Sequence, residues 1–205
     1  MAQTPDSSGH EYGPATALVV VDMQNDFAHP DGSLHVEGGD AIVDAVNAEM
    51  TAADDAGATV VLTQDWHPPV TPHFAKDGGT WPVHCVGDTW GAELVEGLRA
   101  HADAVVRKGT NGEDGYSAFT MRDTTTGEDV PTGLAGMLRE RGVTEVVVVG
   151  LATDVCVLAT ALDAASSGFD THVLWEATRP VETDAATADR VIAEMREGDV
   201  RVVGV

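Results

Sequence analysis

The chain has 205 residues, of which 43% are hydrophobic, and this length predicts one domain that buries a core without help from disulfides. Its 34 acidic and 11 basic residues give a formal net charge of −23, so nucleic acid and anionic membrane surfaces are poor candidates as partners. The longest apolar run is too short to cross a bilayer and no secretory signal is visible, so we expect a cytoplasmic protein.

Residues 1–15 are polar and aperiodic, and we expect a flexible leader followed by a single domain over residues 16–205. From there, short runs of β-branched residues alternate with alanine-rich amphipathic stretches. The predicted strands cover residues 18–22, 59–64, 104–107, 145–149, 171–175 and 201–203. The predicted helices cover residues 39–56, 91–100, 132–141, 153–167 and 183–196.

The predicted strands are nearly continuous apolar runs, which is typical of strands buried on both faces. Their alternation with helices predicts a three-layer α/β/α domain around a mostly parallel six-stranded sheet, with a Rossmann-type topology. Four helices end near a glycine that can adopt a left-handed conformation. These are Gly57, Gly142, Gly168 and Gly198. Two long segments, residues 65–90 and 109–130, interrupt the alternation, and loops of this length in a compact domain are usually functional or disordered.

Residues capable of chemistry follow four of the strands, and ligands bind beyond the carboxyl ends of parallel strands. Asp22, Asp65 and Lys108 follow three of them, and Cys156 lies just inside the helix after the fourth. Backbone N–H groups at a helix start favour a thiolate, which suits a nucleophile, although free cysteines are commonly buried structural residues. An aspartate can exchange protons with the thiol and a lysine can hold the charges in place, so the convergence favours a Cys–Asp–Lys catalytic site.

One carboxylate and three imidazoles lie within twenty residues of each other in the first long segment. They are Asp65, His67, His73 and His84. Such a set is typical of a site for a divalent metal, although a lone histidine is more often a surface or core residue. Asp65 and His67 would point to the same side if the strand simply continued. Cys85 could ligate as a thiolate, but a packed thiol beside His84 is the favoured interpretation.

These motifs resemble the isochorismatase-like cysteine hydrolases, and within them the nicotinamidases, from about Ala17 to the C-terminus. The sequences that carry the resemblance are VDMQNDF (21–27), DWHP (65–68) with His73, WPVHC (81–85), RKG (107–109), YSAF (116–119) and GLATDVCV (150–157). The wider superfamily shares the strand with its aspartate and the turn with its cysteine. The DWH, His73 and WPVHC cluster is similar to the metal-dependent nicotinamidases.

The resemblance implies an enzyme that hydrolyses nicotinamide to nicotinate and ammonia in NAD salvage, through a thioester on Cys156. It implies that Asp22 shuttles protons and that Lys108 positions the pair. A cis peptide bond is implied between Leu151 and Ala152, with the backbone N–H groups of Ala152 and Cys156 as the oxyanion hole.

The resemblance also implies one divalent metal ion, zinc foremost with iron or manganese as alternatives, which holds the pyridine nitrogen of the substrate. Its implied ligands are Asp65, His67 and His84, with His73 as the fourth. The implied aromatic walls are Phe27, Trp81 and Tyr116. We expect nicotinamide as the small-molecule partner. The resemblance implies that a homo-oligomer is one option, and the sequence leaves the oligomeric state open.

Three alternatives stay open from the sequence. The chain could hydrolyse another small amide or a vinyl ether of the isochorismate type, although neither reaction needs a metal cluster. The metal could instead activate water directly, with Cys156 purely structural. The chain could also be an inactive relative that serves as a binding domain, although the intact set of Asp22, Lys108 and Cys156 weighs against this.

Overall fold

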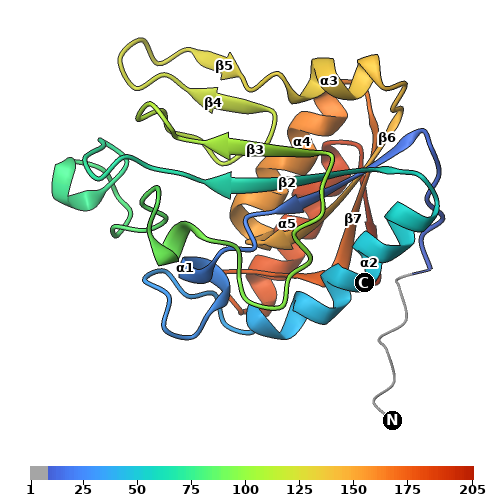
Figure 1. Ribbon diagram of the computed structural model, residues 1–205, viewed down its shortest axis with the longest axis horizontal. Coiled ribbons are helices and arrows are strands. Elements are labelled where there is room, and N and C mark those ends of the chain that lie inside the picture. Colours follow the sequence, from blue (N-terminus) through green and yellow to red (C-terminus); the bar gives the residue numbers. More distant parts are fainter. Residues whose placement is uncertain (1–8) are drawn as a thin grey trace.

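The computed structural model describes residues 9–205, so residues 1–8 of the predicted leader lie outside the described range. A six-stranded sheet forms the middle layer, with strand order β3-β2-β1-β6-β7-β8 and every neighbouring pair parallel (Figure 1). Its strands are β1 (Thr16–Val21), β2 (Thr59–Asp65), β3 (Ala104–Lys108), β6 (Glu145–Leu151), β7 (Asp170–Arg179) and β8 (Val200–Val203). The predicted fold class is therefore confirmed.

Helices cover both faces of the sheet (Figure 1). They are α1 (Asn25–Ala28), α2 (Val43–Asp55), α3 (Leu134–Glu140), α4 (Leu158–Ser166) and α5 (Ala185–Glu197). Along β1, Leu18 and Val20 pack into the hydrophobic core under α2, whereas Val19 and Val21 pack into the core under α3, α4 and α5. Because successive side chains of a strand point to opposite faces, both sets must be apolar, and this explains the continuous apolar runs in the sequence.

The chain builds one half of the sheet from β1 to β3 and then returns to the other side of β1 with β6. The strand order therefore reverses between β1 and β6, and such a switch point opens a crevice beyond the strand ends. Val21 pairs with Gly150 there. Gly150 has a φ of 107°, and a side chain at this position would collide with the Val21 carbonyl, so only glycine allows the two strand ends to meet.

The helix predicted over residues 91–100 is wrong. A single 3-10 turn covers Trp90–Ala92, after which the backbone pairs with the segment that follows β1, where the Val95 N–H donates to the Met23 carbonyl at 2.9 Å. Ala92 and Val95 are buried by this pairing. Their spacing resembles that of a helix, but hydrogen bonds to a distant segment decide the conformation.

The predicted loop over residues 109–130 contains a two-stranded antiparallel hairpin that the sequence did not reveal. It consists of β4 (Thr120–Arg122) and β5 (Asp129–Pro131). Both strands are short and neither is buried, so they carry no apolar pattern that could have predicted them.

All four helices end next to the predicted glycines, but the glycine adopts the left-handed conformation at only three of them. The three with a positive φ are Gly57, Gly142 and Gly168. Gly198, which follows α5, has a φ of −88°, and Asp199 adopts the left-handed conformation instead. A side chain at position 198 would require the end of the Leu162 side chain to shift.

The described part of the predicted leader contacts the domain. The Tyr12 hydroxyl donates to Glu49 Oε2 at 2.8 Å, and the ring of His10 lies 5.0 Å from that of His172 between centroids. The domain boundary at residue 16 stays a prediction. None of the helices described for residues 9–205 has the length and apolar character that a membrane crossing requires.

Candidate active site

A pocket opens beyond the carboxyl ends of the central strands, at the switch point of the sheet. It contains the three predicted aromatic residues, namely Phe27, Trp81 and Tyr116. It also contains Leu151, Ala152 and Cys156. Sequence reasoning missed its aliphatic walls, because an aliphatic side chain carries no chemical signature of a site. These are Leu34, Val36, Val155 and Val181.

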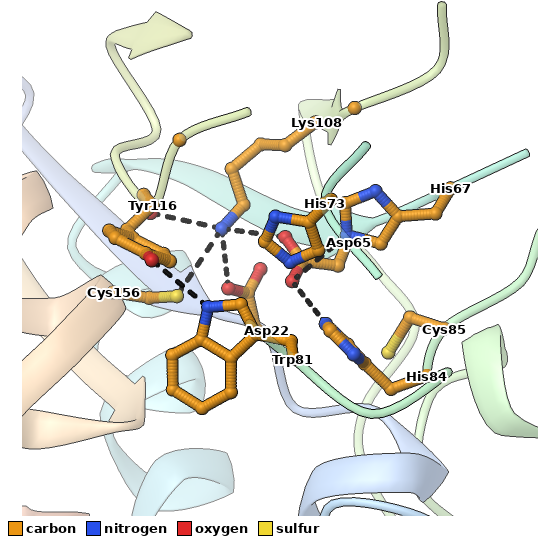
Figure 2. A network of polar contacts seen from close by, with 12 residues as sticks. Asp22, Asp65, His67, His73, Trp81, His84, Cys85, Lys108, Tyr116 and Cys156 are labelled. Atoms are coloured by element: carbon orange, nitrogen blue, oxygen red, sulfur yellow. Dashed lines mark hydrogen bonds and ion pairs between the residues drawn. The ribbon is translucent and has the colours of Figure 1, made fainter. Parts of the chain in front are cut away.

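The Lys108 ammonium lies at the centre of one half of the site (Figure 2). Its Nζ donates to Asp22 Oδ2 at 2.6 Å, to the Tyr116 carbonyl at 2.9 Å and to Cys156 Sγ at 3.6 Å. Asp65 Oδ1 lies 2.9 Å from Nζ and makes a further ion pair with Lys108. The structure thus brings the predicted Asp22, Lys108 and Cys156 together around one buried cation.

Burial and neighbouring charges set the protonation of this half of the site. Burial alone would lower the pKa of Lys108, but Asp22 and Asp65 raise that pKa well above its ordinary value. Burial raises the pKa of Asp22 in spite of the nearby ammonium. Burial also raises the pKa of Cys156 well above its ordinary value, so the lowering that we expected from the helix start is not found. Cys156 therefore rests as a thiol beside a carboxyl that can accept its proton.

Asp22 is held by its own backbone and by a hydroxyl that sequence reasoning missed. Its φ of 47° lies in the left-handed region, which few non-glycine residues adopt. The Asp22 N–H donates to Thr63 Oγ1 at 3.1 Å, and this hydroxyl donates back to Asp22 Oδ1 at 2.6 Å. Thr63 and Lys108 thus each hold one carboxylate oxygen. The available signal was a polar residue inside the apolar strand β2.

Cys156 lies in a π-helical turn over Thr153–Val157 rather than in the regular helix predicted there. The carbonyl of Ala152 accepts hydrogen bonds from the N–H groups of Val155 and Val157 at 3.1 and 3.0 Å. The peptide bond between Leu151 and Ala152 is cis, as the resemblance implied. The oxyanion-hole role of Ala152 and Cys156 stays a prediction.

The second half of the site gathers the predicted metal ligands next to Lys108 (Figure 2). His67, His73 and His84 each offer one nitrogen, and these atoms lie within 4.8 Å of one another. Asp65 Oδ2 lies 3.7 Å from the Nε2 atoms of both His67 and His84. Burial would raise the pKa of Asp65, but Lys108 and the two imidazoles hold that pKa well below its ordinary value. Asp65 is therefore a carboxylate, the form that binds metal.

Backbone pairing brings the two parts of this long loop together. The His67 N–H donates to the Cys85 carbonyl at 2.9 Å, so the segment with His84 runs beside the segment with His67. The ring of Phe74 is fully buried and contacts the rings of His67 and His84. Cys85 Sγ faces the Gly91 carbonyl at 3.8 Å, which favours the packed-thiol interpretation of this residue.

The residues present fit a divalent metal ion. Within residues 9–205, neither ring nitrogen of His67 has a hydrogen-bond partner, although both are buried. A buried polar group without a partner costs about 1–3 kcal/mol, which ligation would offset. Two outer contacts orient the other imidazoles, since His84 Nδ1 lies 2.7 Å from the Pro82 carbonyl and His73 Nδ1 lies 2.6 Å from Asp114 Oδ1. Such contacts leave Nε2 available as a ligand.

Comparison with known proteins gives consistent similarities. Residues 16–203 match the Isochorismatase domain. A nicotinamidase of Acinetobacter baylyi is 39% identical over 188 residues, which cover 83% of this chain and 84% of that protein. The structure of PnC1 from L. infantum in complex with nicotinate is 40% identical, with a TM-score of 0.83 over 96% of this chain and 93% of that one. The structure of pyrazinamidase from Pyrococcus horikoshii in complex with zinc is 37% identical, with a TM-score of 0.81 over 94% and 100% of the two chains. These similarities confirm the resemblance found in the sequence.

Proposed function

Because this chain belongs to the isochorismatase family, we infer that it is an amidohydrolase that converts nicotinamide to nicotinate and ammonia, a step of NAD salvage. The observation that carries this function is the Lys108 ammonium, which contacts both Asp22 and Cys156 at the wall of a pocket that also holds His73 and His84. The relatives named as nicotinamidase and found with nicotinate support the choice of substrate.

In the first half of the reaction, Asp22 takes the proton of the Cys156 thiol while Sγ attacks the carboxamide carbon. A carbon–sulfur bond forms and the carbon–nitrogen bond breaks, and Asp22 returns the proton to the nitrogen, which leaves as ammonia. Burial supports this exchange, because it raises the pKa of Asp22 toward the range in which a carboxyl both takes and gives protons. Lys108 keeps the carboxylate and the sulfur in place.

In the second half, Asp22 takes a proton from water, whose oxygen attacks the thioester carbon. The carbon–sulfur bond breaks, the product leaves as the carboxylic acid and ionises in water to nicotinate, and the proton on Asp22 returns to Cys156. In both halves the carbonyl oxygen becomes negative, and we assign its stabilisation to the backbone N–H groups of Ala152 and Cys156. These roles account for the placement of both residues at the pocket wall.

The residues that would hold a metal ion are Asp65, His67 and His84, with His73 as the fourth ligand. When bound, a divalent ion, with zinc as our first choice, would supply a Lewis-acidic position for the ring nitrogen of nicotinamide. The zinc complex of the Pyrococcus horikoshii relative supports a divalent metal here. Trp81 Nε1 donates to the Tyr116 hydroxyl at 3.0 Å, and Phe27 lies against His84, so these aromatic residues can flank the ring. A homo-oligomer and a cytoplasmic location stay predictions.

The test is ammonia release from nicotinamide by the purified chain, before chelation, after chelation and after zinc is restored. We expect activity that the chelator removes and zinc restores. Benzamide, which lacks the ring nitrogen, is the matched control substrate and should react far more slowly. A metal-loaded chain that releases no ammonia from nicotinamide would contradict the assignment and favour another small amide. Equal rates on both amides would contradict the role given to the metal group.

A further inference from the structure

A second group of metal-ligating side chains lies at the opposite end of the sheet from the pocket. His10, Glu145 and His172 each offer one ligand atom, and the three atoms lie within 4.8 Å of one another. Glu145 is the first residue of β6, whereas Leu151, its last, lines the pocket. A strand rises about 3.3 Å per residue, so this length of β6 places the two groups about 20 Å apart. The second group therefore takes no part in the reaction proposed above.

Three separate segments bring these side chains together. Glu145 pairs with Asp170 across β6 and β7, and His172 follows two residues later, on the same face of β7 as Asp170. His10 lies in the segment that precedes β1, and Thr16 of β1 pairs with Glu145 on its other side. Pairing within the parallel sheet therefore fixes the positions of Glu145 and His172, whereas His10 comes from the segment that precedes β1.

The distances from the Glu145 carboxylate to the two imidazoles suit a tetrahedral metal ion. Glu145 Oε1 lies 3.2 Å from His172 Nε2 and 3.5 Å from His10 Nε2. A tetrahedral zinc ion with bonds of about 2.0–2.2 Å keeps neighbouring ligand atoms about 3.3–3.6 Å apart. The Thr16 hydroxyl donates to Glu145 Oε2 at 2.9 Å, which directs Oε1 toward the two imidazoles. Little movement is needed to close these atoms around an ion.

Burial and charge around the group also favour a cation. The side chains of His10 and His172 are only 9% and 11% exposed, and Asp170 Oδ1 lies 3.6 Å from His172 Nε2 as a further carboxylate. Arg201 Nη1 lies 3.3 Å from the same nitrogen and would have to move aside. Its side chain is 66% exposed, so solvent can accommodate the displaced guanidinium.

We propose that His10, Glu145 and His172 bind a second divalent metal ion, zinc or another transition metal that prefers imidazole ligands. Two imidazoles and one carboxylate form a ligand set that zinc accepts, with a fourth position left for water. The ion would attach the segment before β1 to the starts of β6 and β7. Its effect would be on stability, since the group lies far from the pocket.

The test measures zinc binding to the metal-free full-length chain in which H67A and H84A have removed two ligands of the pocket group. We expect this chain to bind one zinc ion. Adding H10A should weaken zinc binding at least about tenfold. Loss of a residue that only hydrogen-bonds to a metal ligand already has an effect of that size, and loss of a ligand itself costs no less. Adding E145Q should weaken zinc binding to a similar extent. Because glutamine has nearly the same volume as glutamate, this second variant tests the site even if H10A folds poorly.

The matched control is H101A, because His101 is an exposed histidine that lies 3.6 Å from a carboxylate of Asp54. It should leave the zinc affinity unchanged. Zinc affinity that neither H10A nor E145Q changes, or the absence of zinc binding, would overturn the proposal. In the chain that keeps its pocket ligands, H10A should leave ammonia release unchanged. Failure of the wild-type chain to hydrolyse nicotinamide would count against the proposed function alone.

Discussion

Replacing Cys156 with alanine distinguishes the thioester route from direct attack by water. Cys156 Sγ lies 3.6 Å from Lys108 Nζ, which is itself 2.6 Å from Asp22, so the variant removes the atom on which both neighbours act. Loss of one catalytic side chain from a hydrolytic triad lowers kcat by about 10⁴–10⁶-fold. That corresponds to about 5–8 kcal/mol in activation free energy, at about 1.4 kcal/mol for each factor of ten. We expect a loss in this range for ammonia release from nicotinamide by the zinc-loaded C156A variant.

The matched control is C85A, which also removes a fully buried thiol but one that faces the Gly91 carbonyl. We expect C85A to lose some stability and to retain its kcat. Intact-mass analysis after acid quenching should find an acyl group on the wild-type chain and none on C156A. If C156A loses less than about tenfold in kcat, the metal would be activating water directly and the thioester mechanism would be wrong.

Three further variants test contacts around the site and at a distance from it. D114N, which weakens the hydrogen bond to His73, should lower zinc affinity by about 10–100-fold in equilibrium dialysis, while kcat at saturating zinc changes little. T63V keeps its volume but leaves Asp22 without a buried hydroxyl partner, so urea unfolding should show a loss of about 1–3 kcal/mol. Asp184 caps α5, and its hydrogen bonds hold its pKa below the ordinary value. The ionised Asp184 should stabilise the fold fully above its unfolded pKa of about 3.9, and this stabilisation should be lost as the pH falls through its lower folded pKa. The Tm difference between wild type and D184A should therefore shrink in acid.

For D114N a control variant is available, and for T63V and D184A one outcome would contradict the prediction. The control for D114N is E113Q. Glu113 is the neighbour of Asp114, but its carboxylate contacts Asn111, so E113Q should leave the zinc affinity unchanged. If T63V unfolds with the same urea midpoint as the wild type, then water or a rearranged neighbour replaces the lost hydroxyl. A Tm difference for D184A that stays constant from neutral pH to pH about 3 would contradict the capping argument.

Among the residues that sequence analysis found, Asp22, Asp65 and Lys108 are the ones whose position follows from strand ends. Asp22 and Lys108 each come at the end of an apolar strand, and parallel strands bring such residues to one edge of the sheet. Thr63 and Asp114 were missed, because their roles depend on strand register and on loop packing between segments 41 residues apart. The raised pKa of Cys156 was missed for a related reason, since burial depends on what the rest of the chain packs around the thiol.

Asp65 connects the two halves of the site, because its two oxygens serve different neighbours. Oδ1 lies 2.9 Å from Lys108 Nζ, whereas Oδ2 lies 3.7 Å from the Nε2 atoms of His67 and His84. Asp65 and Lys108 are direct partners in the β2–β3 register, so strand pairing sets their contact. A register shift of one residue would turn one side chain to the opposite face and separate the imidazoles from the Cys156 group. The sheet itself therefore fixes the spacing between the group that would hold the ring of the substrate and the thiol that would attack its carboxamide.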